Sequence, residues 1–197
     1  LPAQPECLAA DPGHFVPGQG NVSQTPAAPG FYVENGTAIE QTPCPPGTFQ
    51  PEPGQFGCLQ AEPGFYVDTY ASPNQNPCPI GEYQLLGGQF NCTMASSGHY
   101  VGSLGSPSQQ PCFLGTYQPG VGQDTCISSL PGFFVSHEGA TAQEPCYYGY
   151  FQSEPSQMTC IPAELGYFVD ELGSSEQFGA DSGHFVNQNA STSQTPC

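Results

Sequence analysis

Ten cysteines carry the most specific chemistry in this sequence of 197 residues. Eight of them form four couples with one constant spacing of fourteen positions, at Cys44 and Cys58, Cys78 and Cys92, Cys112 and Cys126, and Cys146 and Cys160. No two cysteines stand at the Cys-x-x-Cys spacing of a zinc site. The thiols therefore predict disulfides that form in an oxidising, extracellular compartment.

The cysteines are positioned by a repeat of 17 residues. Glycine recurs eleven times at this spacing without an insertion, at positions 13, 30, 47, 64, 81, 98, 115, 132, 149, 166 and 183. An aromatic residue stands two places after each glycine, and Val or Gln follows it. Four units carry Cys three residues before the glycine and eleven after it, whereas seven carry Ala or Ser and then Gln. The predicted domain plan is the end of a truncated unit at 1–7, then eleven units over 8–197 that end at the first Cys of a further unit.

The two cysteine positions always change together, which favours a disulfide between the two cysteines of each unit. A rival scheme joins the second Cys of one unit to the first Cys of the next cysteine unit, as Cys58 with Cys78, and uses all ten thiols. Within-unit pairing leaves Cys7 and Cys197 to split units, which either an inter-chain disulfide between head-to-tail copies or a longer polypeptide completes. Where Gln replaces Cys, we expect stacked Gln side chains to form hydrogen-bonded ladders.

Each unit predicts two short strands around a turn. A strand-like stretch follows the glycine, a turn-prone patch lies about seven residues after it, and a second extended piece often ends with Pro. Gly and Pro recur too often for helices.

One unit cannot fold alone. Ordering 17 residues costs on the order of 25 kcal/mol. One buried aromatic returns only about 5 kcal/mol, and a disulfide about 3 kcal/mol. We therefore predict an all-β, elongated tandem-repeat rod of disulfide-stapled, hairpin-like modules, with a β-solenoid as the alternative.

The cysteine units resemble a known extracellular repeat. The segment from Cys44 to Cys58, CPPGTFQPEPGQFGC, is similar to the ephrin-receptor-like cysteine-rich repeat and to the first small module of tumour-necrosis-factor-receptor-type repeats. The resemblance implies a disulfide that closes a Gly-x-Tyr loop, in agreement with the within-unit pairing, and an extracellular scaffold. It covers the four cysteine units well and the other seven only by register. The Cys-x-x-Cys link usual in these families is replaced here by Gln-x-Pro.

Four of the seven asparagines stand in Asn-x-Ser/Thr, the acceptor motif of N-glycosylation: Asn21, Asn35, Asn91 and Asn189. Three of them fall in predicted turns, where an acceptor is exposed. Asn91 is the exception, because Cys92 lies inside its motif. The sequence therefore predicts covalent glycans.

Composition excludes several classes of function. The chain has no Lys or Arg and a formal net charge of -17, so nothing neutralises phosphate and nucleic-acid binding is excluded. No apolar run is long enough for membrane insertion. His14, His99 and His184 share one repeat position and follow one another at intervals of five whole units. They therefore predict neither a metal site nor a catalytic site. We expect no cofactor and no enzymatic activity.

These patterns predict a secreted or cell-surface structural protein. It would be a glycosylated subunit of a filament, stalk or cell-surface appendage, and its partner would be another copy of itself, head to tail in a fibre. The alternative is a ligand-binding or adhesive ectodomain module of a surface receptor or adhesin. Regular units without insertions favour the structural role.

Overall fold

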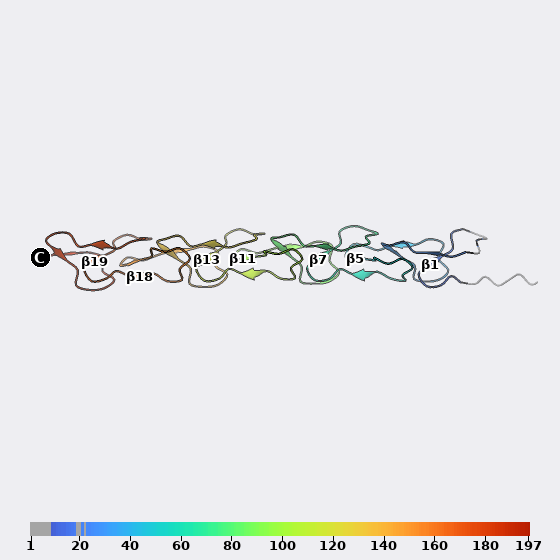
Figure 1. Ribbon diagram of the computed structural model, residues 1–197, viewed down its shortest axis with the longest axis horizontal. Helices are drawn as coiled ribbons and strands as arrows, with labels where there is room; N and C mark the ends of the chain where they lie inside the picture. The colour runs from blue at the N-terminus through green and yellow to red at the C-terminus, as the bar shows by residue number, and fades with distance from the viewer. Residues whose placement is uncertain (1–8, 19–20, 22) are drawn as a thin grey trace, which may run out of the picture. The chain divides into compact units, whose positions relative to one another are not determined.

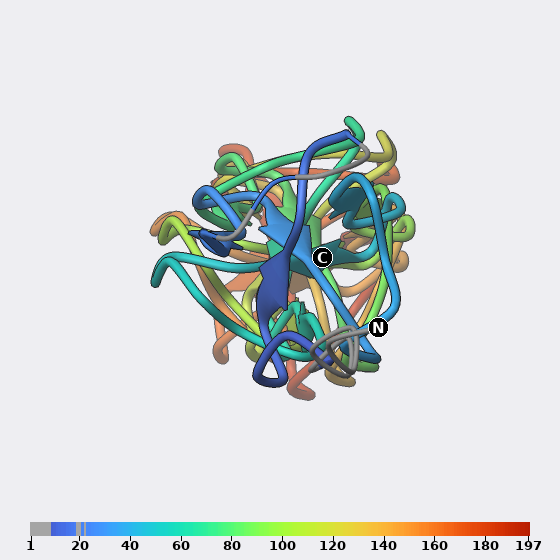
Figure 2. The same cartoon turned by 90° about the vertical axis from the view of Figure 1, so that its right-hand side faces the viewer.

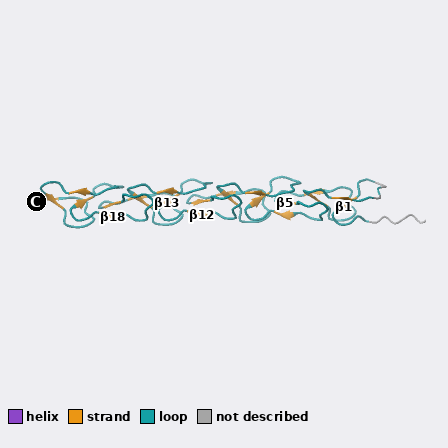
Figure 3. Ribbon diagram, viewed as in Figure 1, coloured by secondary structure: helices purple, strands orange, loops and turns teal. Residues whose placement is uncertain are grey.

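The computed structural model describes residues 9–18, 21 and 23–197, and in these residues it contains strands, turns and loops but no helix (Figure 3). Strands of two residues pair in chain order into eleven antiparallel hairpins. The prediction of an all-β protein built of hairpin modules is confirmed.

The first strands of the hairpins all begin directly after a repeat glycine. They are β1 (His14–Phe15), β3 (Phe31–Tyr32), β5 (Thr48–Phe49), β7 (Phe65–Tyr66), β9 (Glu82–Tyr83), β11 (His99–Tyr100), β13 (Thr116–Tyr117), β15 (Phe133–Phe134), β17 (Tyr150–Phe151), β19 (Tyr167–Phe168) and β21 (His184–Phe185). The second strands are β2 (Thr25–Pro26), β4 (Thr42–Pro43), β6 (Leu59–Gln60), β8 (Asn76–Pro77), β10 (Thr93–Met94), β12 (Gln110–Pro111), β14 (Ile127–Ser128), β16 (Glu144–Pro145), β18 (Ile161–Pro162), β20 (Phe178–Gly179) and β22 (Thr195–Pro196).

We define a module as the 17 residues from three before a repeat glycine to thirteen after it, and we name each module by its glycine. The cysteine modules are Gly47, Gly81, Gly115 and Gly149, and the other seven are the cysteine-free modules. Contacts divide the chain into two units, residues 1–93 with 103–108 and residues 94–102 with 109–197 (Figure 1). Modules are built in the same way in both units.

A β-turn at the repeat glycine starts each hairpin. In module Gly47 the amide of Thr48 donates to the carbonyl of Pro45 at 3.0 Å, and Gly47 has φ +86°. Pro46 precedes the glycine. This is the type II turn, which favours Pro at its second position and needs a positive φ at its third. The turn reverses the chain immediately before β5.

The core of a module consists of two side chains, three residues before and three residues after the glycine. In module Gly64 these are Ala61 and Val67, which are 1% and 0% exposed. In module Gly47 they are Cys44 and Gln50, which are both buried. In the first unit, drawn blue to green in Figure 2, the strands lie inside the loops of that unit. So small a core must be covered by neighbouring modules.

Consecutive modules are joined by isolated backbone hydrogen bonds, and they share no β-sheet. In the first unit Gly30 donates to the carbonyl of Gln50 at 2.7 Å, and Val33 donates to that of Gln55 at 3.0 Å. Equivalent bonds recur in the second unit. Every sheet of the described residues has two strands from one module. The β-solenoid alternative, which requires neighbouring coils to pair strand on strand, is therefore wrong.

Modules two places apart also touch, through the repeat glycine. A Cβ placed on Gly64 would lie 2.1 Å from the carbonyl oxygen of Gly105 in the first unit. A Cβ on Gly132 would lie 2.0 Å from the carbonyl oxygen of Gly173 in the second. The repeat glycine is thus required twice, for its positive φ and for the close approach of another backbone.

Candidate functional site

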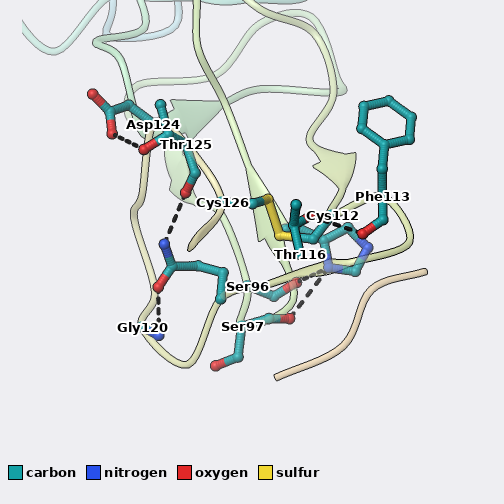
Figure 4. Close-up of a disulfide and its surroundings, with 11 residues drawn as sticks. Ser96, Ser97, Cys112, Phe113, Thr116, Gly120, Asp124, Thr125 and Cys126 are labelled. Carbon is teal, nitrogen blue, oxygen red and sulfur yellow. Dashed lines mark hydrogen bonds between the residues drawn. A yellow bond between two sulfur atoms is a disulfide. The ribbon is translucent and has the colours of Figure 1, made fainter. Parts of the chain in front are cut away.

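The predicted disulfides lie within the cysteine modules. They join Cys44 to Cys58, Cys78 to Cys92, Cys112 to Cys126 and Cys146 to Cys160, with Cα atoms 5.7–5.8 Å apart. The first Cys of each couple is fully buried and the second is half-buried. Figure 4 shows Cys112 and Cys126 closing the hairpin loop of module Gly115. The within-unit pairing is confirmed, and the rival pairing between successive cysteine units is wrong.

In the cysteine-free modules a Gln side chain closes the same loop by a hydrogen bond. The Oε1 of Gln143, for example, accepts from the backbone amide of Leu130 at 2.8 Å. All seven glutamines at this position accept from the amide 13 residues earlier in their own module, at 2.6–2.9 Å. The expected Gln ladders between modules are therefore wrong. A backbone amide of the same loop lies close to the Gln side chain and donates to its Oε1 atom. That oxygen is therefore not available as the acceptor for a ladder between modules.

A third position, whose role was not predicted from the sequence, changes together with the cysteines. The residue three after the glycine is Gln in every cysteine module and Val in every cysteine-free module. Gln118 is 5% exposed; its Nε2 donates to the carbonyl of Thr125 at 2.8 Å, and its Oε1 accepts from the amide of Gly120 at 3.1 Å (Figure 4). Val135 fills the same place in the next module with an aliphatic side chain. This residue is Gln only where the module has its two cysteines, and that correlation in the sequence would have indicated that Gln118 belongs to the loop closure.

His14 and His99 occupy a packing position between modules two places apart. His99 begins β11, and a Cβ on Gly139 would lie 3.9 Å from its Cε1 atom. Phe65 takes the same place against Gly105, and Phe133 takes it against Gly173. A ring of any of these types serves as the packing surface. Among the described residues no group of three or more His, Cys, Asp or Glu side chains is placed to hold a metal ion.

Two of the four glycosylation motifs lie on hairpin loops and are described completely there. Asn35 is exposed in the loop between β3 and β4, and Thr37 donates to its Oδ1 from both the backbone amide (3.4 Å) and Oγ1 (2.8 Å). Asn189 is exposed in the loop between β21 and β22, but Ser191 of its motif is only 6% exposed. Oγ of Ser191 donates to the carbonyl of Ser193 at 2.9 Å.

The other two motifs are more constrained. Asn91 is exposed, but its carbonyl accepts from Nε2 of Gln84 at 2.9 Å and Cys92 of its motif is held in a disulfide. Asn21 is exposed and its Nδ2 donates to the carbonyl of Pro17. Residue 22 of that motif lies outside the described residues.

The two kinds of module present different surfaces. Most of the exposed large apolar side chains belong to the cysteine modules. In the second unit Phe113 and Tyr147, which directly follow the first Cys of their modules, are 59% and 61% exposed, and Leu114 and Tyr148 beside them are exposed as well. Most of the acidic residues, in contrast, stand in the cysteine-free modules. A shallow hollow in module Gly166 and the start of the next is lined by Phe168, Asp170, Glu171, Phe178, Gly179 and Asp181.

The last two predicted sites are only partly described. Cys197 is exposed and unpaired, and its backbone amide donates to the carbonyl of Gly183 at 2.9 Å. Cys7 and the predicted segment 1–7 lie outside the described residues. A disulfide between Cys7 and Cys197 of two chains stays a prediction. Within the described residues no helix has the length and apolar character needed to cross a membrane.

No protein-family model matches the chain. No curated protein matches it in sequence.

Proposed function

We propose that the chain is a non-enzymatic, extracellular structural protein, the glycosylated subunit of a filament, stalk or cell-surface appendage. Four disulfides and the repetition of one hairpin module support an extracellular scaffold. The resemblance of the cysteine modules to ephrin-receptor-like and tumour-necrosis-factor-receptor-type repeats supports the same compartment.

The observation that carries the proposal is the docking of modules two places apart. The contact uses a repeat glycine and a backbone carbonyl, so any module of this pattern can continue it. Gly166 and Gly183 have nothing within 4 Å of a Cβ position, whereas a Cβ on Gly132 or Gly149 would meet a carbonyl oxygen at 2.0 or 2.2 Å. We propose that further modules of the same pattern cover Gly166 and Gly183. Where a second copy supplies these modules, the result is a head-to-tail fibre in which Cys197 pairs with Cys7 of the next copy.

Electron microscopy and sedimentation of the purified, oxidised chain over a range of concentrations test this proposal. We expect fibres whose length increases with concentration. Gly166→Ala should shorten them, because the added methyl occupies the position of the incoming carbonyl, and a substitution in an exposed loop such as Ser103→Ala is the matched control. Monomeric particles at every concentration, or fibres that Gly166→Ala leaves unchanged, would contradict head-to-tail docking.

A second candidate is an adhesive or ligand-binding ectodomain module. It is favoured by the exposed Phe113, Leu114, Tyr147 and Tyr148 of the cysteine modules, because aromatic residues contribute most to protein interfaces. Adhesion of fluorescent chain to intact cells measures this role. Under this alternative, Tyr147→Ser with Tyr148→Ser abolishes adhesion while fibre formation continues; under the structural proposal neither changes.

A further inference from the structure

The four glycosylation motifs differ in how completely the folded module encloses them. N-glycosylation joins Nδ2 of Asn to the anomeric carbon of an oligosaccharide carried on a polyprenyl diphosphate. The bond from that carbon to the diphosphate oxygen breaks, Nδ2 loses one proton, and the polyprenyl diphosphate leaves. The transferase must reach both the Asn side chain and the hydroxyl two residues later, because the motif is defined by both. The exposure of that hydroxyl residue therefore decides whether a folded chain is an acceptor.

At Asn35 both parts of the motif are accessible. Asn35 and Thr37 are exposed, and their side chains are already joined by the hydrogen bond from Oγ1 to Oδ1 at 2.8 Å. This local turn brings the hydroxyl beside the amide. The backbone of the motif is bonded to the preceding module, because the amide of Ala10 donates to the carbonyl of Gly36 at 2.9 Å, but the side chains of Asn35 and Thr37 stay exposed. Among the described residues Nδ2 of Asn35 makes no hydrogen bond, so the nucleophilic nitrogen is not engaged by the protein.

At Asn189 the hydroxyl is hidden and the backbone is clamped. Ser191 is 6% exposed and its Oγ is committed to the carbonyl of Ser193. The amide of Ala190 donates to the carbonyl of Ala163 at 2.8 Å, and the carbonyl of Ser191 accepts from Val169 at 3.0 Å. Two inter-module bonds thus hold the motif in place, and Ala190 is fixed at φ +54°. An enzyme can engage this motif only after module Gly183 has separated from its neighbours.

We infer that the fold divides these motifs into one that accepts a glycan after folding, Asn35, and one that accepts a glycan only before its module docks, Asn189. Both asparagines are exposed, and the backbone of both motifs is bonded to the preceding module. The two motifs differ in the hydroxyl residue, because Thr37 is exposed and Ser191 is buried. Glycan at Asn189 would therefore record a modification that preceded folding. This inference depends on the glycosylation proposed above.

Transfer in vitro to the full chain tests the inference. The chain is produced without glycans, oxidised, and checked for its four disulfides by peptide mapping. It is then incubated with a purified oligosaccharyltransferase and a polyprenyl-diphosphate-linked oligosaccharide. Synthetic peptides 30–42 and 184–196 measure how good an acceptor each motif is when unfolded. Chymotryptic peptides are analysed by mass spectrometry, because the chain has no Lys or Arg for trypsin.

We expect occupancy of Asn35 in the folded chain to match that of its peptide, and occupancy of Asn189 to fall at least tenfold below that of its peptide. Thr37→Ala should abolish modification of Asn35, and Ser191→Thr should leave Asn189 closed in the folded chain. Two results would overturn the inference. One is equal occupancy of Asn35 and Asn189 in the folded chain, relative to their peptides, and the other is an occupancy of Asn35 far below that of its peptide. Failure of both peptides as acceptors would overturn the proposed glycosylation as well, so the two failures are distinguishable.

Discussion

Replacement of a repeat glycine by alanine separates its two structural roles. Gly132 and Gly166 both belong to cysteine-free modules of the second unit, and they have nearly the same φ, +84° and +86°. A Cβ on Gly132 would lie 2.0 Å from the carbonyl oxygen of Gly173, whereas a Cβ on Gly166 has nothing within 4 Å. Gly132→Ala therefore tests the turn and the docking together, and at concentrations where the chain is monomeric Gly166→Ala tests the turn alone.

The expected free energies of unfolding follow from these two geometries. An alanine at positive φ costs about 1–2 kcal/mol, which is the whole penalty for Gly166→Ala. In Gly132→Ala the carbonyl of Gly173 must also move by about 1.4 Å or more to reach an ordinary contact distance. That movement breaks the bond from the amide of Gly173 to the carbonyl of Cys146, 2.8 Å long, and strains the bond from Gly132 to Gln152, each of which contributes about 1 kcal/mol. We expect Gly132→Ala to cost about 3–4 kcal/mol in total.

Hydrogen exchange followed by mass spectrometry is the assay, because repeat proteins unfold locally and a single denaturation midpoint averages over modules. Gly132→Ala should accelerate exchange of the Gly173 amide, and Gly166→Ala should leave that amide protected. The reasoning is refuted if the two substitutions have the same effect, since the positive φ alone would then explain the glycine repeat. It is also refuted if Gly132→Ala leaves exchange at Gly173 unchanged.

Three other predictions concern the loop closures. Gln152→Val should cost about 1–3 kcal/mol, because it removes two hydrogen bonds of the buried Gln152 side chain, one to the carbonyl of Thr159 and one from the amide of Glu154, and faster exchange of the Glu154 amide measures it. Ala163→Cys with Gln177→Cys should form a fifth disulfide worth about 3 kcal/mol; thiol titration detects it, and Ser at both positions is the control. Reduction of the disulfides should raise exchange in the cysteine modules before the cysteine-free modules, whose loops keep their Gln hydrogen bonds; equal loss of protection in both would show that the Gln bonds do not close the loops.

The local structure of a module was predictable from the sequence because short-range rules decide it. A Pro-Gly pair such as Pro46 and Gly47 specifies a type II turn within four residues. Cysteines that change together specify their own pairing. Both signals lie inside one module and need no knowledge of how modules pack.

The loop closures of the cysteine-free modules were less accessible to sequence reasoning. Gln143 has a long side chain with a donor and an acceptor, and a ladder of like side chains is one way to satisfy them. The structure instead uses the amide of Leu130, which every residue type except Pro offers equally and which therefore leaves no mark in the sequence. The hydrogen bonds of Gln118 were not predictable for a related reason, since both partners are backbone groups of its own loop.

The sequence by itself determined the 17-residue period, the hairpins, the disulfide partners and the four candidate acceptor asparagines, because each depends on residue types at short spacing. Only the tertiary structure decided that modules dock at one and two places along the chain, and that Ser191 is enclosed while Thr37 is not. Docking depends on the approach of one backbone to another, as between Gly132 and Gly173, which belong to different modules. Backbone carbonyls are the same in every residue, so the sequence identifies the glycine but not the carbonyl that it meets.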